Sequence, residues 1–254
     1  MLRDPYWRCA LVGHKVLPGL SPGTKEDTAC GREFLRDLKS RRPADPILAI
    51  TDGAPGLIRA AEEMFPPSLR QRCLAHKIRN LEAKVPAELW WEVNARPLAA
   101  YQAPRPMLAE LAREEFVKRF ERELPTATSC FQDDFAACIT HLRLPIAHRR
   151  VIRTTNLLER LFGEERRRTK VIQPAFGERA VVKLMYAALI RASQTSRRVV
   201  IDEFEQRQIE EIRSEINEEF KHRMAPAVFS ASHHKIYSKI KTRPSISRKS
   251  AHVL

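Results

Sequence analysis

The spacing of hydrophobic residues predicts a helix, a strand and a second helix in the first part of the chain. Residues 28–38 have helical spacing, and the apolar side chains on one face are Phe34, Leu35 and Leu38. Residues 47–51 form a short apolar run between turn signals, a pattern typical of a buried strand although ambiguous by itself. Pro55 then begins a predicted helix to Phe65, whose inner face comprises Leu57, Ile58, Ala61 and Met64.

The hydrophobic pattern of the rest of the chain is mainly helical. Residues 66–100 are predicted to be helical with an interruption near Pro86, and residues 103–145 to form several short helices. An apolar helix is predicted over residues 181–190. An amphipathic helix is predicted over residues 201–220, with a hydrophobic stripe made of Ile209, Ile212, Ile216 and Phe220.

These patterns divide the chain into four parts of an α/β protein. We expect a first part of the core in residues 1–102, a helical insertion in 103–145 and a second part of the core with a basic helix in 146–200. Residues 201–254 hold the amphipathic helix and a tail. Within them, residues 221–254 contain eight Lys and Arg and no Asp or Glu, which predicts a poorly ordered basic tail.

The composition is that of an ordinary globular protein. Hydrophobic residues make up 43% and charged residues 30% of the 254 positions, which excludes a disordered or collagen-like chain. No run of eighteen apolar residues occurs and the N-terminus lacks a secretory pattern, so we expect no membrane span. Five irregularly spaced cysteines argue against a disulfide framework and for a reducing compartment. We therefore expect a cytoplasmic protein.

The balance of charge is strongly basic. Lys and Arg number 45 against 31 Asp and Glu, a formal net charge of +14. A protein this basic most often binds a polyanion, which in the cytoplasm is usually nucleic acid. The alternative is a basic surface or tail without a specific partner.

Asp52 directly follows the predicted strand and precedes the predicted helix. In open α/β sheets this is the edge at which ligands bind and chemistry takes place. An aspartate in such a place is also often only a cap or turn residue.

Two sequence motifs give Asp52 a more specific meaning. The first reads Asp52-Gly53-Ala54-Pro55-Gly56-Leu57, then Phe65-Pro66, then Gln71-Arg72-Cys73-Leu74-Ala75-His76. The second reads Ile152-Arg153-Thr154-Thr155-Asn156-Leu157-Leu158-Glu159-Arg160 and is followed by the basic run Arg166-Arg167-Arg168-Thr169-Lys170. Over roughly residues 10–195 the chain resembles the bacterial Mutator-type insertion-sequence transposases. Met64 departs from the pattern, which prefers a small or β-branched residue there.

The resemblance implies a ribonuclease H-like catalytic core with a DDE triad, in which Asp52 is the second acid and Glu159 the third. It implies DNA as the partner, self-association on DNA, and strand cleavage and transfer at transposon ends in the presence of Mg²⁺ or Mn²⁺. The residue types agree, because phosphodiester chemistry needs two divalent ions and carboxylates that converge in space. Asn156 is a candidate N-cap for the helix carrying Glu159. Glu164 and Glu165 remain alternatives for the third acid, and Glu159 itself could lie on a solvated helix face.

Basic residues surround the second motif. They would hold DNA phosphates near the metal ions, although such a run is a solvated face in most proteins. The candidate DNA-binding residues are Arg149, Arg150, Arg153, Arg160, Arg166, Arg167, Arg168 and Lys170.

Cys73 and His76 have the spacing of half a zinc site. A tetrahedral site needs four ligands, and Cys9 and His14 are a poor match for a second pair. The favoured interpretation is a half-buried pair that supports the fold or the substrate, with its role in the motif undefined.

The first acid of the triad has no counterpart in this chain. In the family it lies on an earlier strand in a Leu-Asp-Gly segment, whereas Asp4 matches neither that context nor that spacing. We therefore expect a chain truncated at the N-terminus, without the first strand of the core and with little or no transposition activity alone. The alternative from a different class is a catalytically inactive DNA-binding remnant. A basic RNA-binding protein is a weaker third possibility.

Overall fold

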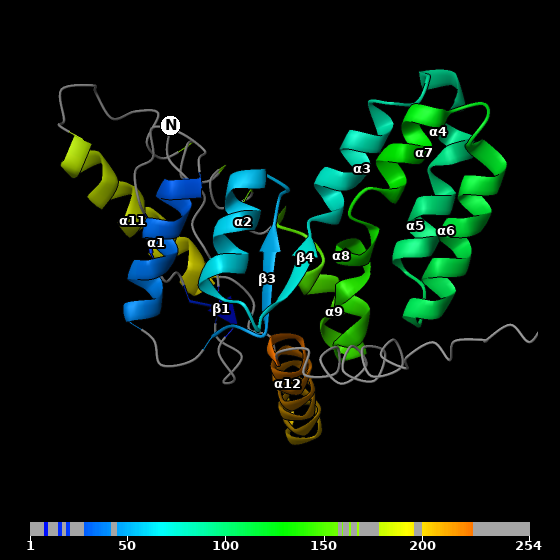
Figure 1. The fold of residues 1–254 in the computed structure, drawn as a ribbon. Helices are drawn as coiled ribbons and strands as arrows, with labels where there is room; N and C mark the ends of the chain where they lie inside the picture. Colours follow the sequence, from blue (N-terminus) through cyan, green and yellow to red (C-terminus); the bar gives the residue numbers. More distant parts are fainter. Residues whose placement is uncertain are drawn as a thin grey trace, which may run out of the picture. The chain divides into compact units, whose positions relative to one another are not determined.

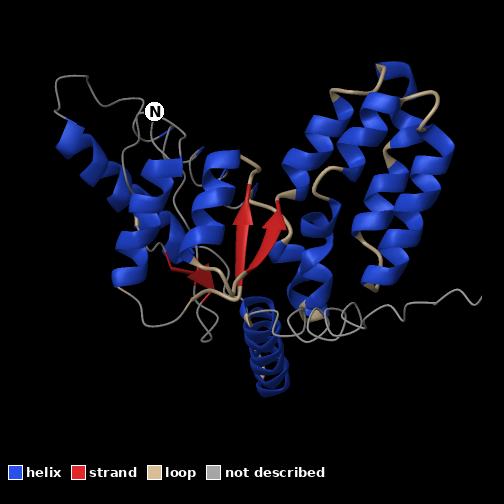
Figure 2. Cartoon of the chain, viewed as in Figure 1, coloured by secondary structure: helices blue, strands red, loops and turns tan. Residues whose placement is uncertain are grey.

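The computed structural model describes residues 8–9, 15–16, 19–20, 28–41, 45–156, 159, 163, 167, 178–195 and 200–225. The chain divides into two compact units, Met1–Asn217 and Glu218–Leu254. The described residues are mainly helical with short strands (Figure 2), which is compatible with the expected α/β class.

The strands of the described residues form two separate pairs. In the first, β1 (Arg8–Cys9) and β2 (Lys15–Val16) are antiparallel. In the second, β3 (Leu48–Thr51) and β4 (Leu69–Arg72) are parallel and in register from Leu48 opposite Leu69 to Thr51 opposite Arg72. Both strands of the parallel pair therefore end at the same edge, where Figure 1 shows β4 leading into α3.

The prediction of helix for the start of residues 66–100 is wrong over β4. This strand reads Leu-Arg-Gln-Arg, and its only fully buried side chain is that of Gln71. A strand with so little alternation of apolar and polar residues cannot be recognised from its own sequence. It forms because its backbone pairs with that of β3. The predicted strand over 47–51 is confirmed as β3.

Two helices from the N-terminal part of the chain pack against each other and against β3. Helices α1 (Thr28–Ser40) and α2 (Pro55–Met64) lie side by side (Figure 1) and confirm the two predicted helices. A Cβ added at Gly31 would lie 3.2 Å from the Cβ of Ala60, so the two small residues allow this close approach. The buried side chains at the contact are Leu35, Leu38, Ala60 and Ala61.

A cluster of short helices follows β4, as predicted for residues 103–145. Pro106 and Pro125 each stand in the first turn of a helix, where their lack of an N–H has no cost. The hydrophobic core of this cluster also contains Leu74 and Leu81, so it begins with α3, before the predicted boundary at 103. The elements are α3 (Leu74–Glu82), η1 (Ala87–Leu89), α4 (Trp90–Val93), α5 (Ala95–Tyr101), α6 (Pro106–Phe120), α7 (Pro125–Gln132), α8 (Phe135–Ile139), η2 (Thr140–Arg143) and α9 (Ile146–Ile152).

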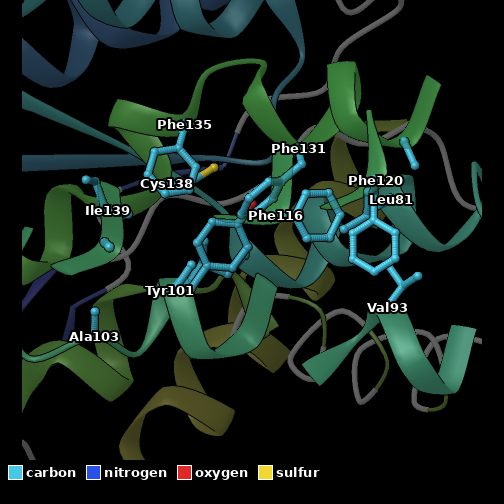
Figure 3. Packing of buried hydrophobic residues seen from close by; sticks show 14 of the residues in the cluster. Leu81, Val93, Tyr101, Ala103, Phe116, Phe120, Phe131, Phe135, Cys138 and Ile139 are labelled. Carbon is cyan, nitrogen blue, oxygen red and sulfur yellow. The ribbon is translucent and has the colours of Figure 1, made fainter. Parts of the chain in front are cut away.

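Aromatic rings fill the centre of this cluster. Phe131 is fully buried, and its ring centroid lies 4.5 Å from that of Phe116, 5.3 Å from Phe135 and 5.7 Å from Tyr101. Figure 3 shows these rings gathered around Phe131, with the sulfur of Cys138 beside Phe135. The side chain of Cys138 is fully buried and belongs to this core.

Buried polar groups join β4 to the helical cluster. The side chain of Gln71 donates from Nε2 to the carbonyl of Cys138 (3.0 Å) and accepts at Oε1 from the backbone N–H of His141 (2.7 Å). Nε2 of His141 in turn donates to the carbonyl of Tyr101 (3.0 Å). Arg70 forms a bidentate ion pair with Asp134, which stands in the left-handed region at φ 57° before α8. The cluster is thus tied to the sheet by satisfied hydrogen bonds.

We expect the buried imidazole of His141 to make the protein less stable in acid. Burial lowers the pKa of His141 to about 4, against about 6.5 in the unfolded chain. The unfolded state therefore binds more protons between these values, so this contribution is complete above pH 6.5 and is lost as the pH falls towards 4. We expect a loss of about 2 kcal/mol after allowance for solvent screening, measured by urea unfolding at a series of pH values.

The control for this prediction is His141→Asn, which cannot titrate. The variant should show a shallower pH dependence than the unaltered protein over the same range. An equal slope in both proteins would contradict the assignment to His141.

Two further helices confirm the predicted C-terminal elements. Helix α11 (Glu178–Thr195) contains the predicted run 181–190, and α12 (Glu203–Met224) covers the predicted run 201–220 from Glu203 onward. The prediction of a poorly ordered tail from residue 221 is wrong for residues 221–224, which continue α12 to Met224. In this last turn Nζ of Lys221 pairs with Oε1 of Glu218 at 2.6 Å. Residues 226–254 lie outside the described residues. None of the described helices is long and apolar enough to cross a membrane.

Candidate functional site

Asp52 lies where the sequence predicts it, directly after β3 at the carboxyl end of the parallel pair. Its Oδ1 accepts a hydrogen bond from the backbone N–H of Ala54 (3.0 Å), which closes a turn at the start of α2. The side chain is half-buried. The turn therefore fixes one carboxylate oxygen of Asp52 at the end of the strand.

The backbone next to Asp52 has a conformation that requires glycine. Gly53 has a φ of +108°, and a Cβ at this position would lie 1.9 Å from Cζ of Arg72. The guanidinium of Arg72, at the end of β4, thus packs against the bare backbone of Gly53. Its Nη1 also lies 3.7 Å from Oδ2 of Asp134.

Cys73 connects the two sequence motifs. Its backbone N–H donates to the carbonyl of Thr51 (2.8 Å), which continues the ladder between the parallel strands. Its buried sulfur accepts hydrogen bonds from both the backbone N–H and the Oγ1 of Thr155, each at 3.2 Å. The next residue, Leu74, donates its N–H to the carbonyl of Arg153 (2.9 Å). Residues 153–155 are therefore docked at the strand edge that carries Asp52.

Glu159 follows this docked segment by one helical turn. Its backbone N–H donates to the carbonyl of Thr155 (3.2 Å), so the carboxylate belongs to the first turn of a helix. Arg79 donates from Nη2 to both carboxylate oxygens, at 3.0 and 3.3 Å, and Nε2 of His76 lies 3.6 Å from Oε1. His76 and Arg79 are three residues apart on α3, so they present one face of that helix to Glu159.

The prediction that Asn156 caps this helix is wrong. Asn156 is itself in helical conformation and Thr155 precedes it. Its Oδ1 is buried and has no hydrogen-bond partner within the described part of the chain. Asn156 is predicted as the cap because asparagine is common at that position. The residue that precedes the helix is Thr155, whose hydroxyl donates to the sulfur of Cys73.

The described basic residues of the second motif have different surroundings. Arg149 donates to the carbonyls of Leu142 (2.7 Å), Leu144 (2.9 Å) and Pro104 (2.9 Å), which gives it a structural role at the end of the helical cluster. Arg150 and Arg167 are exposed, and Arg153 is half-buried. The remaining predicted DNA-binding residues lie outside the described residues, namely Arg160, Arg166, Arg168 and Lys170.

The described residues offer no closed metal centre. No group of three or more His, Cys, Asp or Glu side chains that could hold a metal occurs among them. Cys73 and His76 contact each other instead, with Nδ1 of the ring 3.2 Å from the sulfur. Cys73 is fully buried and His76 is half-buried, and their role in the motif stays a prediction. The alternative acids Glu164 and Glu165 lie outside the described residues.

Sequence reasoning missed three contributors to this site. Arg79 could have been found, because it lies one turn after His76 on the predicted helix. Thr155 stands inside the second motif but gives no sign of contacting Cys73, 82 residues earlier. Arg72 is part of the first motif, and its contact with Gly53 depends on the pairing of β3 with β4.

The sequence of this chain is similar to those of known proteins. Residues 9–197 match the family described as "Transposase, Mutator family". The chain is 35% identical over 158 residues to the transposase for insertion sequence element IST2 of Acidithiobacillus ferrooxidans, covering 62% of this chain and 53% of that protein. It is 34% identical over 188 residues to the transposase for insertion sequence element IS6120 of Mycolicibacterium smegmatis, covering 74% and 58%. The chain thus matches little more than half the length of these relatives. It belongs to the Mutator family of transposases.

Proposed function

We propose that this chain carries the catalytic region of a DNA transposase of the DDE type, built on a ribonuclease H-like core. Asp52 and Glu159 would be its second and third acids. The observation that supports this most is the docking of residues 153–155 on Cys73 and Leu74. It brings the second motif to the strand edge that carries Asp52. The names of the relatives support transposition as the reaction.

The donor set fits a divalent cation shared with the substrate. Mg²⁺ usually takes one or two carboxylates from the protein and completes its octahedron with water and phosphate oxygens. Asp52 and Glu159 supply such carboxylates, and the absence of a three-ligand group among the described residues argues against a closed protein-only site. When bound, Mg²⁺ or Mn²⁺ would stabilise the charge on the oxygens around the reacting phosphorus.

The chain's own residues would orient these groups and hold the DNA. The Ala54 N–H fixes one oxygen of Asp52, and Arg79 neutralises Glu159 in the absence of a cation. The guanidinium of Arg79 is half-exposed, so it can reach a phosphate when a cation replaces it at Glu159. Arg150 and Arg167 are exposed and would contribute salt-dependent affinity for the phosphate backbone. Self-association would bring two transposon ends together.

Metal binding tests the proposal. Titration of Mn²⁺ followed by electron paramagnetic resonance should show binding by the unaltered chain. Asp52→Asn and Glu159→Gln each remove one charged oxygen donor with little change of shape, and each should weaken binding about tenfold. The matched control is Glu115→Gln, an exposed carboxylate on α6, which should leave the affinity unchanged.

The same measurements distinguish the transposase from the alternative, a catalytically inactive DNA-binding remnant. Duplex DNA binding that is sensitive to salt, together with no Mn²⁺ binding that depends on Asp52 or Glu159, would indicate a catalytically inactive DNA-binding remnant. Equal Mn²⁺ affinity in all four proteins would overturn the assignment of the two acids.

A further inference from the structure

We infer that Cys73 and His76 act together as a positioning pair for Glu159. In this pair the thiol sets which ring nitrogen of His76 carries the proton, so that an N–H is directed at the carboxylate. The inference rests on the proposed function for what Glu159 does. It assigns a role to the Cys-x-x-His part of the first motif, which that function leaves unexplained.

The surroundings of the sulfur determine the direction of its own hydrogen bond. A thiol offers one S–H donor and weak acceptor sites. The backbone N–H and the hydroxyl of Thr155 both lie at 3.2 Å from the sulfur and occupy its acceptor sites. The remaining neighbour is Nδ1 of His76, also at 3.2 Å. The S–H is therefore free to donate to Nδ1.

This direction fixes the state of the imidazole. A neutral imidazole with an acceptor at Nδ1 carries its proton on Nε2. Nε2 is the ring nitrogen that lies 3.6 Å from Oε1 of Glu159. The N–H of His76 thus faces a carboxylate, whereas the opposite tautomer would place two lone pairs against each other.

The backbone fixes the positions of Cys73 and His76 relative to each other. Cys73 stands immediately before α3 and is fully buried, while His76 lies in the first turn of that helix. The N–H of Lys77 donates to the carbonyl of Cys73 (3.0 Å), which closes that turn. Cys73 therefore touches the segment leading to Glu159 on one side and the ring facing Glu159 on the other. Groups placed in this way around ligand residues typically change metal affinity about 10- to 100-fold.

Nuclear magnetic resonance of the ring nitrogens tests the arrangement without any metal. In the full chain labelled with ¹⁵N-histidine, at a pH where the imidazole is neutral, His76 should be in the Nε2–H state. Cys73→Ala should lower the fraction of the Nε2–H state, because Nδ1 loses its donor while Glu159 remains, and Cys73→Ser, which keeps a donor, should retain it. An unchanged fraction in Cys73→Ala would show that the thiol does not set the tautomer. The Nδ1–H state in the unaltered protein would overturn the inference.

Metal affinity tests the link to Glu159. The side-chain amide of Gln reaches about as far as Nε2 of histidine, and that of Asn about as far as Nδ1. His76→Asn should therefore weaken Mn²⁺ binding about tenfold, and His76→Gln clearly less. In the Glu159→Gln background, His76→Asn should have no further effect, because the carboxylate it positions is gone.

The outcomes separate this inference from the proposed function. If the unaltered chain binds no Mn²⁺, the proposed function fails while the nitrogen resonances still decide on the Cys73–His76 arrangement. If His76→Asn weakens Mn²⁺ binding equally with and without the Glu159 carboxylate, the role is merely structural and the inference is overturned. Thermal unfolding of each variant gives the stability against which the affinities are compared.

Discussion

Replacing Phe131 with alanine is expected to lower the free energy of unfolding by about 3–5 kcal/mol. The ring is fully buried between Phe116, Phe135 and Tyr101, so its removal leaves a cavity that the short surrounding helices cannot close. The lost edge and tilted ring contacts add to the loss of buried area. Urea unfolding followed by circular dichroism measures the effect.

Two control variants sharpen this prediction. Phe131→Leu keeps most of the volume and should cost less than about 2 kcal/mol. Met107→Ala, at a position 69% exposed on α6, should change the stability by no more than about 0.5 kcal/mol. A cost for Phe131→Ala as small as that for Met107→Ala would show that the aromatic centre is not the core of the cluster.

The second large effect is expected for Gly53→Ala, with a loss of about 2–4 kcal/mol. The backbone at φ +108° is strained for any residue with a Cβ, and the new methyl group would lie 1.9 Å from Cζ of Arg72. The guanidinium must then move away from Gly53 and from Asp134. Because Gly53 adjoins Asp52, we also expect weaker Mn²⁺ binding in this variant.

A double-mutant cycle separates the two causes. In an Arg72→Ala background the steric conflict is gone, so Gly53→Ala should cost only the backbone strain of about 1–3 kcal/mol. Gly163→Ala is the matched glycine control, since Gly163 is helical and a Cβ there would meet no atom of the described residues within 4 Å, and it should not destabilise the protein. An equal cost of Gly53→Ala with and without Arg72 would contradict the role of the Arg72 contact.

The limits of sequence reasoning are clear at β4 and at Asn156. Two of the four residues of β4 are arginines, and these make long-range contacts with Gly53 and Asp134 rather than following a local pattern. Asn156 has the side chain of a common cap, but Thr155 occupies the position before the helix. At β4 partners far away in the sequence override the local preference, whereas at Asn156 the helix begins at the asparagine itself and leaves the capping position to Thr155.

The candidate site was predictable only as separate pieces. Asp52 at the end of a strand and Glu159 near the start of a helix follow from their own neighbours in the sequence. That Arg79 would pair with Glu159, 80 residues later, depends on where α3 and the second motif meet. The hydrophobic periodicity of either segment does not encode this contact between them.

The sequence by itself determined α1, α2, α11 and α12, because each has a local hydrophobic pattern of helical period, and it favoured β3 through a short apolar run between turn signals. It also determined the membership of the Mutator family through its two motifs. Only the tertiary structure decided that the parallel pairing of β3 with β4 places Cys73 beside Thr155 and His76 beside Glu159. The physical reason is that such contacts arise when separate elements pack and satisfy each other's buried polar groups, which no single stretch of sequence encodes.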